Sequence, residues 1–522
     1  FSKKLENTKA NFIDNTIKLL YLPSENDQIS FTHFYTTDFY KLDLITNIEN
    51  ISSSDNSYDF STFNQTLSWI RSISEKAFIK TTFVNSNYSP KTLFKESEAN
   101  NTITFQSQIN FSKINSEYSK KVNEKLDYYI GIQANRYNIN PGSLDPGNGN
   151  SINPVKLNDE VSYELSGYSN FNFNPTENIS LSLGLRYTNF YLNGPYTINE
   201  YDTDGLIIGS QLFGEGEKVQ SYSGIEPRFG ASLKLSDDSS VKISYAKINQ
   251  YIQNIYNSTT PLPTSRWKTS DPFILPQSNN TYGLGLFKNL NSKFELSIEG
   301  YYRSTENNLT YKPGADFFLE QFLENDVIQI NGKAYGIEFS LKKPSGRING
   351  WMNYTWAKSL LKSNGNSISE TINSNQWYDS EFDRPHTFNG TINFETDKFN
   401  TWSFNFTAQS GRPYTVANGV FEINDKAVPI FLERNNSRLP FYHRLDFSWK
   451  VAYNKDDYDR WRGDWTLTIY NLYGAKNPLN RYYTEKNGSQ FGNFFGKSPL
   501  GSFNLSVVNS VFVSISYNFK FQ

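Results

Sequence analysis

The chain has 522 residues with 50 basic and 52 acidic side chains, a net charge of -2, and no cysteine. The lack of cysteine excludes disulfide frameworks, thiolate metal sites and cysteine nucleophiles. The near-zero net charge provides no electrostatic attraction to the phosphates of a nucleic acid. Aromatic residues make up 16% of the chain although its mean hydropathy is -0.60. Apolar runs such as Ala427 to Leu432 fall far short of the ~20 residues of a spanning helix, so any membrane-spanning part must consist of strands.

A hairpin near the start of the sequence introduces the recurring unit. Apolar residues alternate at Ile17, Leu19 and Tyr21, then a turn rich in Pro, Asn and Asp follows, and alternation resumes at Ile29. Alternation with period two indicates a strand with two different faces, and these turn residues supply the required backbone geometry. The unit recurs at nine turns, which begin at Pro23, Ser72, Ser119, Asn174, Ser236, Lys288, Lys343, Glu395 and Asn454.

Nine turns join eighteen strands, and the end of the chain adds a nineteenth. The connections between hairpins are long and rich in Asn, Ser, Gly and Pro, as in Phe190 to Ser221 and Pro413 to Leu439. Short turns at one end and long loops at the other are typical of a bacterial outer-membrane barrel. We therefore predict an all-β chain whose residues 1–522 form one transmembrane antiparallel up-and-down β-barrel domain. A soluble repeat or propeller protein is the alternative.

The last strand has the clearest two-faced pattern in the chain. Apolar side chains occupy every odd position, and the residues between them are mostly polar. A strand of this kind, ending in aromatic residues at the C-terminus, is how an outer-membrane barrel usually finishes, although the edge strand of a soluble sandwich has the same pattern. We expect this strand to be the one that guides barrel assembly, through Val511, Val513, Ile515, Tyr517, Phe519 and Phe521.

The nineteen predicted strands make an incomplete barrel. If the C-terminus is periplasmic, the first strand, Ile17 to Leu22, also runs towards the periplasm, and an upward strand must precede it. An open sheet edge in hydrocarbon leaves backbone groups unpaired, at several kcal/mol each. We therefore expect about 19 strands of a 22-stranded barrel, with three strands and any N-terminal plug outside this sequence.

Several stretches in the second half resemble the barrel of TonB-dependent outer-membrane receptors of the Bacteroidetes type. The resemblance covers roughly 300 residues from Ile225 onward. Residues 17–187 share the same alternation of strands and turns but not the motifs. The matching stretches begin with IEPRFGASLKL, SYAKINQYIQNIYN, PFILPQSNNTYGLG and YGIEFSLKK and continue with DRPHTFNG, QSGRPYT, RNNSRLPFYHRLDFSW and YNLYGAKNP. The resemblance implies a plugged 22-stranded barrel that imports a nutrient, driven by a TonB-type energy-coupling protein. The sequence shows no plug-like segment and no coupling box, which departs from that pattern.

The motifs also contain polar candidates. In the strand from Leu445 to Tyr453 the apolar face points to lipid, which sends Arg444, Asp446 and Lys450 into the lumen, where they pair with each other or with a plug. We interpret Arg384 and His386 of DRPH and Arg412 of SGRP as polar groups at the barrel rim.

Four aromatic residues on long loops are candidates for contact with a ligand or a partner: Trp267, Phe317, Trp377 and Tyr378. The alternative is that they pack loop against loop or belong to the outer aromatic girdle. His33, His386 and His443 are far apart in sequence, so no metal, cofactor or catalytic site is expected. The further alternative of an enzyme would need a pairing such as His386 with Asp383.

These patterns favour a TonB-dependent receptor that takes up a scarce nutrient. The expected location is the outer membrane, with long loops extracellular and with the short turns and C-terminus periplasmic. The expected partners are the lipid bilayer, the energy-coupling protein if a plug is present, and surface lipoproteins or other outer-membrane subunits. The alternative is a structural barrel subunit of a larger outer-membrane complex that does not transport. The substrate cannot be inferred from the fold.

Overall fold

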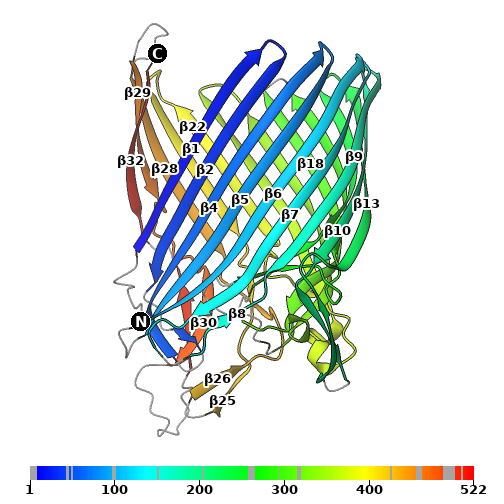
Figure 1. Ribbon diagram of the computed structural model, residues 1–522. Helices are drawn as coiled ribbons and strands as arrows, with labels where there is room; N and C mark the ends of the chain where they lie inside the picture. The colour runs from blue at the N-terminus through cyan, green and yellow to red at the C-terminus, as the bar shows by residue number, and fades with distance from the viewer. Residues whose placement is uncertain are drawn as a thin grey trace.

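In the computed structural model, the described residues are 9–42, 46–48, 51–96, 101–149, 152–202, 205–256, 265–291, 293–313, 315, 319–423, 426–453, 461–485, 500–506 and 510–521. They form a tall curved wall of tilted antiparallel strands, with irregular connections gathered at one end (Figure 1). The largest sheet has 22 strands, of which β3 (Thr46–Ile48), β8 (Val155–Lys156) and β21 (Tyr378–Asp379) have three residues or fewer. Subtracting these three leaves nineteen long strands, which confirms the all-β antiparallel prediction.

The nineteen long strands follow chain order around the wall, and each pairs with its neighbours in sequence. They are β1 (Lys9–Ser24), β2 (Asp27–Leu42), β4 (Ile51–Ser74), β5 (Ala77–Glu96), β6 (Thr102–Asn123), β7 (Leu126–Asp145), β9 (Glu160–Thr176), β10 (Ile179–Asn193), β13 (Lys218–Ser236), β14 (Ser239–Gln250), β17 (Gln277–Leu290), β18 (Phe294–Tyr311), β19 (Val327–Lys343), β20 (Ile348–Lys362), β22 (His386–Glu395), β23 (Asn400–Gln409), β28 (Tyr442–Tyr453), β29 (Trp461–Tyr470) and β32 (Phe512–Phe521).

The short turns lie close to where the sequence predicts them. Eight of the nine fall between successive long strands, as at 25–26, 75–76 and 237–238. The predicted turn at Ser119 begins too early, because β6 continues as a paired strand to Asn123. The ninth turn, at 454–460, lies outside the described residues.

In the described part of the chain, β1 pairs with β2, β32 pairs with β29, and no backbone pairing joins β1 to β32. That three further strands complete the barrel stays a prediction.

The outward face of the wall changes chemistry in steps along its strands. Across β14, β17, β18 and β19 the paired rows are Val241, Leu286, Ile298 and Phe339, then Ile243, Leu284, Gly300 and Ile337, then Tyr245, Tyr282, Tyr302 and Tyr335. We call the last set the tyrosine row. Near the turns, Trp69 and Trp449 donate their indole N–H groups to Asp27 and Asn400, at 3.0 and 2.9 Å. An apolar band with aromatic residues at both edges is what a strand wall needs in lipid.

The opposite face is polar and bonded from strand to strand. Thr391 donates to Asn405 at 2.7 Å and Ser403 donates to Asn393 at 2.7 Å, both between β22 and β23. We assign this face to the interior because its hydroxyl and amide groups would lose hydration in hydrocarbon.

The long connections carry small folded elements of their own at the end opposite the C-terminus (Figure 1). They contain the hairpins β11 (Tyr196–Tyr201) with β12 (Ile207–Phe213), β15 (Ile252–Tyr256) with β16 (Ser265–Thr269), β25 (Gly419–Ile423) with β26 (Lys426–Ile430), and β30 (Asn480–Glu485) with β31 (Leu500–Leu505), and the pair β24 (Pro413–Tyr414) with β27 (Ser437–Arg438).

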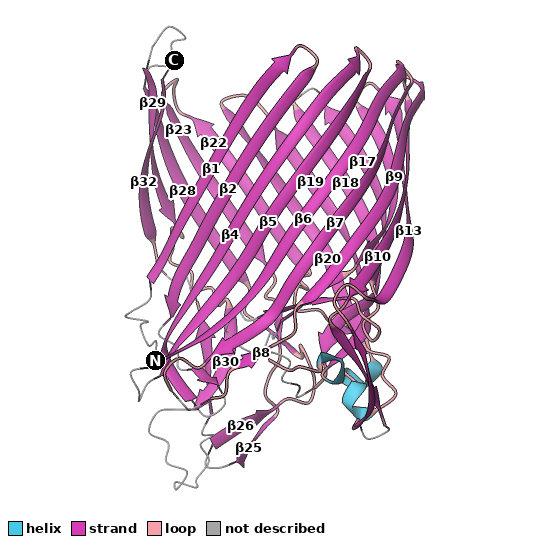
Figure 2. Ribbon diagram, viewed as in Figure 1, coloured by secondary structure: helices cyan, strands magenta, loops and turns pink. Residues whose placement is uncertain are grey.

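The short helices η1 (Leu323–Asn325), η2 (Ile368–Glu370) and η3 (Asn373–Asn375) belong to these connections (Figure 2). Within the described ranges, no helix is long and apolar enough to cross a membrane.

Apolar cores form at the loop end, from the long connections together with the adjoining ends of wall strands. One cluster joins β15, the connection after β16, η1 and the ends of β18 and β19 through Ile255, Ile274, Leu309, Leu323 and Val327. A second contains Phe190 and Leu192 from the end of β10 with Tyr251, whose ring stacks on Phe190 at 5.0 Å between centroids. The long connections are therefore packed structures that cover the rim of the wall.

Candidate functional site at the long-loop end of the barrel

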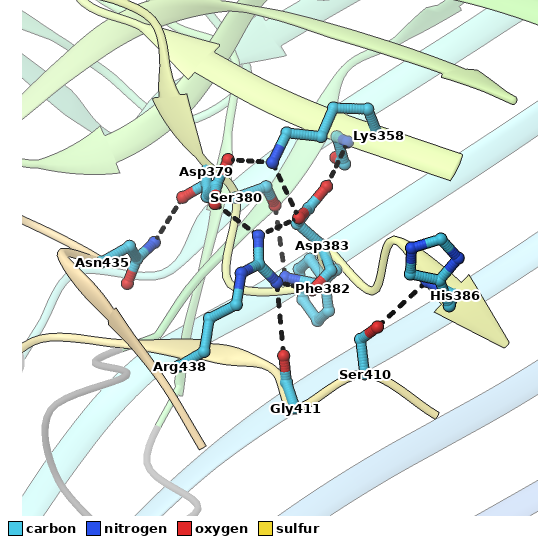
Figure 3. Close-up of polar contacts among 11 residues, drawn as sticks. Lys358, Asp379, Ser380, Phe382, Asp383, His386, Ser410, Gly411, Asn435 and Arg438 are labelled. Atoms are coloured by element: carbon cyan, nitrogen blue, oxygen red, sulfur yellow. Dashed lines mark hydrogen bonds and ion pairs between the residues drawn. The ribbon is translucent and has the colours of Figure 1, made fainter. Parts of the chain in front are cut away.

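Two charged clusters organise the rim. The first, which we call the rim cluster, contains Lys358 of β20, Asp379 of β21, Asp383 and Arg438 of β27 (Figure 3). Lys358 Nζ lies 2.6 Å from Asp379 and 3.3 Å from Asp383, and Arg438 forms ion pairs with both carboxylates. Two cations thus neutralise two anions.

Asp383 is the centre of the rim cluster, because its side chain is fully buried. Its carboxylate also accepts the backbone N–H of Ser359 at 2.6 Å. Arg438 donates to the backbone oxygens of Asp383 and Gly411, at 3.0 and 3.3 Å. A buried carboxylate needs this full set of donors, since an unpaired charge there would cost several kcal/mol. The cluster therefore fastens the 363–385 and 410–441 connections to β20.

The second cluster, which we call the loop lock, lies among three other connections. Lys268 of β16 is 4% exposed and lies 2.6 Å from Glu160 and 2.8 Å from Asp271. Thr269 donates its backbone N–H and its hydroxyl to Glu160, at 2.9 and 2.7 Å. Tyr196 of β11 donates to Asp271 at 2.8 Å. Burial alone would lower the pKa of Lys268, but Asp271 and Glu160 together raise that pKa well above its usual value.

The rim residues expected from the sequence all bond within the chain. Arg384 donates to the side chain of Gln409, and Arg412 Nε donates to the backbone oxygen of Leu479 at 2.9 Å. His386 Nδ1 lies 2.8 Å from the hydroxyl of Tyr354. His386 and Asp383 thus have different partners, an arrangement without the shared hydrogen bond of a catalytic pair.

The three polar residues expected in the lumen lie on the polar face of β28, opposite Leu445, Phe447 and Trp449, and their exposure to a lumen stays a prediction. Arg444 pairs with Asp446 at 2.9 Å, and Lys450 pairs with Asp464 of β29 at 3.2 Å. Asp446 is 5% exposed and also accepts the backbone N–H of Asn471 at 2.9 Å. Their expected contact with a plug stays a prediction.

The three described loop aromatics differ in burial. Trp267 is half-buried in β16, Tyr378 is buried, and Trp377 is 40% exposed with Lys333 Nζ 4.0 Å from its ring centroid. Phe317 lies outside the described residues. Ligand contact by any of them stays a prediction.

The terminal strand pairs with β29 along its whole length. Val513, Ile515, Tyr517 and Phe519 lie opposite Ile469, Leu467, Trp465 and Gly463. The rings of Tyr517 and Trp465 are 4.7 Å apart. Val511 precedes the strand, Phe521 pairs with Trp461 through its backbone, and the Phe521 side chain lies outside the described residues.

Sequence reasoning missed the residues that hold the loops together, Lys268, Lys358 and Arg438. Arg438 lies inside one of the quoted motifs, which is the one signal that could have drawn attention to it. In the described ranges, no group of three or more carboxylate or imidazole side chains could hold a metal ion.

Replacing Asp383 tests the rim cluster. We expect Asp383→Asn to cost about 2 kcal/mol of stability in the two connections, because Lys358 and Arg438 lose a charge-assisted acceptor. The connections should then be cut faster by protease in detergent, which gel electrophoresis would follow. Asp379→Asn is the matched control, and its effect should be smaller because that carboxylate is 25% exposed. Equal cleavage of both variants and the unmodified protein would contradict the assigned role.

Glu381 gives the same region a pH dependence. Burial raises the pKa of Glu381 to about 7, against the lowering effect of Arg412 and Arg434. The Glu381 carboxyl group therefore holds its proton more tightly in the folded protein than in the unfolded chain, where the pKa of this group has its usual value of 4.5. The stabilisation is complete below pH 4.5 and is lost as pH rises through about 7. In thermal unfolding, Glu381→Gln should remove this decline and match the unmodified protein at low pH; an unchanged pH profile would contradict it.

The family described as "TonB dependent receptor-like, beta-barrel" matches residues 6–472. A search of curated protein sequences found no match.

Among solved structures, the ferric yersiniabactin uptake receptor from Yersinia pestis is 14% identical with a TM-score of 0.62, covering 98% of this chain and 70% of the receptor. The ferric preacinetobactin receptor from Acinetobacter baumannii is 12% identical with a TM-score of 0.63, covering 99% and 73%. The unliganded ferric citrate transporter is 10% identical with a TM-score of 0.64, covering 99% and 71%.

At these identities the solved structures show a shared fold. The family match covers most of the chain and agrees with the nineteen-strand wall. The chain therefore belongs to the TonB-dependent receptor-like β-barrel family, whose members are receptors and transporters of the bacterial outer membrane.

Proposed function

We propose that this protein imports a scarce nutrient across the outer membrane by energy-coupled uptake, together with a TonB-type partner. The family match over residues 6–472 is the observation that carries this proposal. The polar inner face of the wall and the bonded loops at one end support it, because a solute must pass a hydrated interior after capture at a rim. The solved relatives are named for ferric chelates, so a metal chelate is the cargo to test first.

We also propose that the long connections are extracellular and that the short turns and C-terminus are periplasmic. The outer-membrane barrels of this type place long loops outside the cell. Surface lipoproteins or other outer-membrane subunits would then meet the loop end.

Single cysteines test this orientation cleanly, because the chain has none of its own. Glu215→Cys lies between β12 and β13 at the loop end, and Asp237→Cys lies in the short turn between β13 and β14. On intact cells, an impermeant maleimide should label Glu215→Cys alone, and lysis should make both reactive. Labelling of Asp237→Cys alone on intact cells would reverse the orientation.

Growth tests the transport function. Deleting the gene in its source bacterium should abolish growth when iron is supplied only as a limiting chelate, or when another scarce nutrient is limiting. The gene should restore growth, and a protonophore should stop uptake of labelled nutrient, since the driving force comes from the inner membrane. Unchanged growth and uptake with each limiting nutrient, combined with stable co-purification with other outer-membrane subunits, would favour a structural subunit instead.

A further inference from the structure

We infer that the free edge of β12 binds an extended, positively charged segment of a partner protein, which adds a third strand to the hairpin of β11 and β12. This hairpin belongs to the connection between β10 and β13 and lies at the loop end (Figure 1). β12 pairs with β11 along one edge, and its other edge pairs with no strand in the described part of the chain. The inference goes beyond nutrient import and needs no step of uptake.

Side-chain contacts of β11 hold the hairpin in place. Tyr196 donates to Asp271 of the loop lock at 2.8 Å, and Tyr201 donates to Glu324 at 2.6 Å. The ring of Tyr201 also lies edge-on to the ring of Phe273, with 6.2 Å between centroids. β11 therefore faces the packed loop region and β12 is the outer strand, so its edge is formed before a partner arrives, which lowers the entropic cost of binding.

β12 exposes large apolar side chains beside this free edge. Leu212 is 78% exposed and Ile208 is 68% exposed. Residues 209–213 pair with β11 in regular register, and Ile208 is the extra residue of a bulge at the end of this stretch. Unpaired backbone groups beside exposed apolar side chains form a template for another strand, and lysine or proline usually protects such an edge. The sequence of β12 contains neither of these residues.

Carboxylates at both ends of the edge determine the charge of the partner. A Cβ atom added at Gly209 would lie 3.1 Å from Glu200 Oε2, so the Glu200 carboxylate lies over β12 at one end. Glu215 and Glu217 follow the other end of the strand. None of these three glutamates forms an ion pair within the described ranges. The five paired residues between them span about 16 Å, which matches a short added strand.

A second copy of this chain does not fit the edge. Two β12 strands in antiparallel pairing would bring Glu200 of one copy beside Glu215 and Glu217 of the other, and like charges opposite each other are destabilising. A strand with basic side chains near its two ends and apolar side chains between them complements the edge instead. Its backbone supplies the missing hydrogen bonds, its apolar side chains cover Leu212, and its cations pair with the glutamates.

Peptide binding to the purified protein in detergent tests the inference. The probe is a fluorescent cyclic β-hairpin peptide whose outward strand alternates valine and threonine and carries lysine at both ends. One control peptide has glutamate in place of lysine. A second control has N-methyl groups on its outward amides, which removes the edge donors and keeps the side chains. In fluorescence anisotropy, we expect the lysine peptide to bind about tenfold or more tightly than either control.

Matched substitutions locate the binding edge. Ile208→Thr combined with Leu212→Thr should weaken binding of the lysine peptide by about tenfold, because the apolar area that the peptide covers is lost. Threonine retains a high strand propensity, so β12 should still form. The control is Val420→Thr with Phe421→Thr, because these residues are also exposed but belong to β25 of another loop hairpin. This control should leave binding within about twofold.

Three results would overturn the inference. A lysine peptide that binds no more tightly than the N-methylated peptide would mean that no strand is added, and one that binds no more tightly than the glutamate peptide would mean that positive charge is not selected. A dimer of the unmodified protein in analytical ultracentrifugation that the β12 substitutions dissociate would assign the edge to a second copy. The peptide comparison uses the unmodified protein, so misfolding of a variant does not decide it. Failure of nutrient import would leave this measurement unchanged.

Discussion

The structure depends on the pairing of backbone N–H and C=O groups in a medium that offers no water. Each unpaired backbone group costs several kcal/mol in hydrocarbon. The N–H and C=O groups of every spanning strand must therefore form hydrogen bonds with the neighbouring strands. Between β1 and β32 the antiparallel ladder meets this requirement, as in the sixteen pairs between β2 and β4, whereas the outer edges of β1 and β32 are not paired with each other in the described residues. Once the ladder is fixed, period-two geometry sends alternate side chains to lipid and to the interior.

A different principle holds the connections. At the loop end, apolar clusters and buried ion pairs join segments that are distant in sequence, as in the contact of Lys268 with Glu160 108 residues earlier. A buried pair of this kind is weak evidence for net stability, but removing one partner is costly, so it fixes which loops lie together. The outward positions of the wall share only an apolar or aromatic character, whereas the rim connections are joined by a few specific charges such as Asp383.

The sequence predicts the wall well because each strand carries its own signal. Alternation at Ile17, Leu19 and Tyr21, and again from Ile29, needs no partner to be recognised, and the turn residues mark where the chain reverses. The loop end has no such local signal. Asp383 and Arg438 are 55 residues apart, and no local sequence pattern around either residue indicates its partner. The position of Trp377 beside Lys333 was likewise not predictable, because it follows from the register of β19, β20 and β21.

The central claim is that the apolar face of the wall contacts lipid and the polar face contacts water. Adjacent positions on β18 test it directly, because Ile298 and Ser297 point to opposite faces and the chain has no other cysteine to label. With a spin label on Ile298→Cys or Ser297→Cys in lipid vesicles, relaxation by dissolved oxygen and by a water-soluble nickel chelate would be compared. The account predicts that oxygen dominates at position 298 and the nickel chelate at position 297. The reverse result would contradict it.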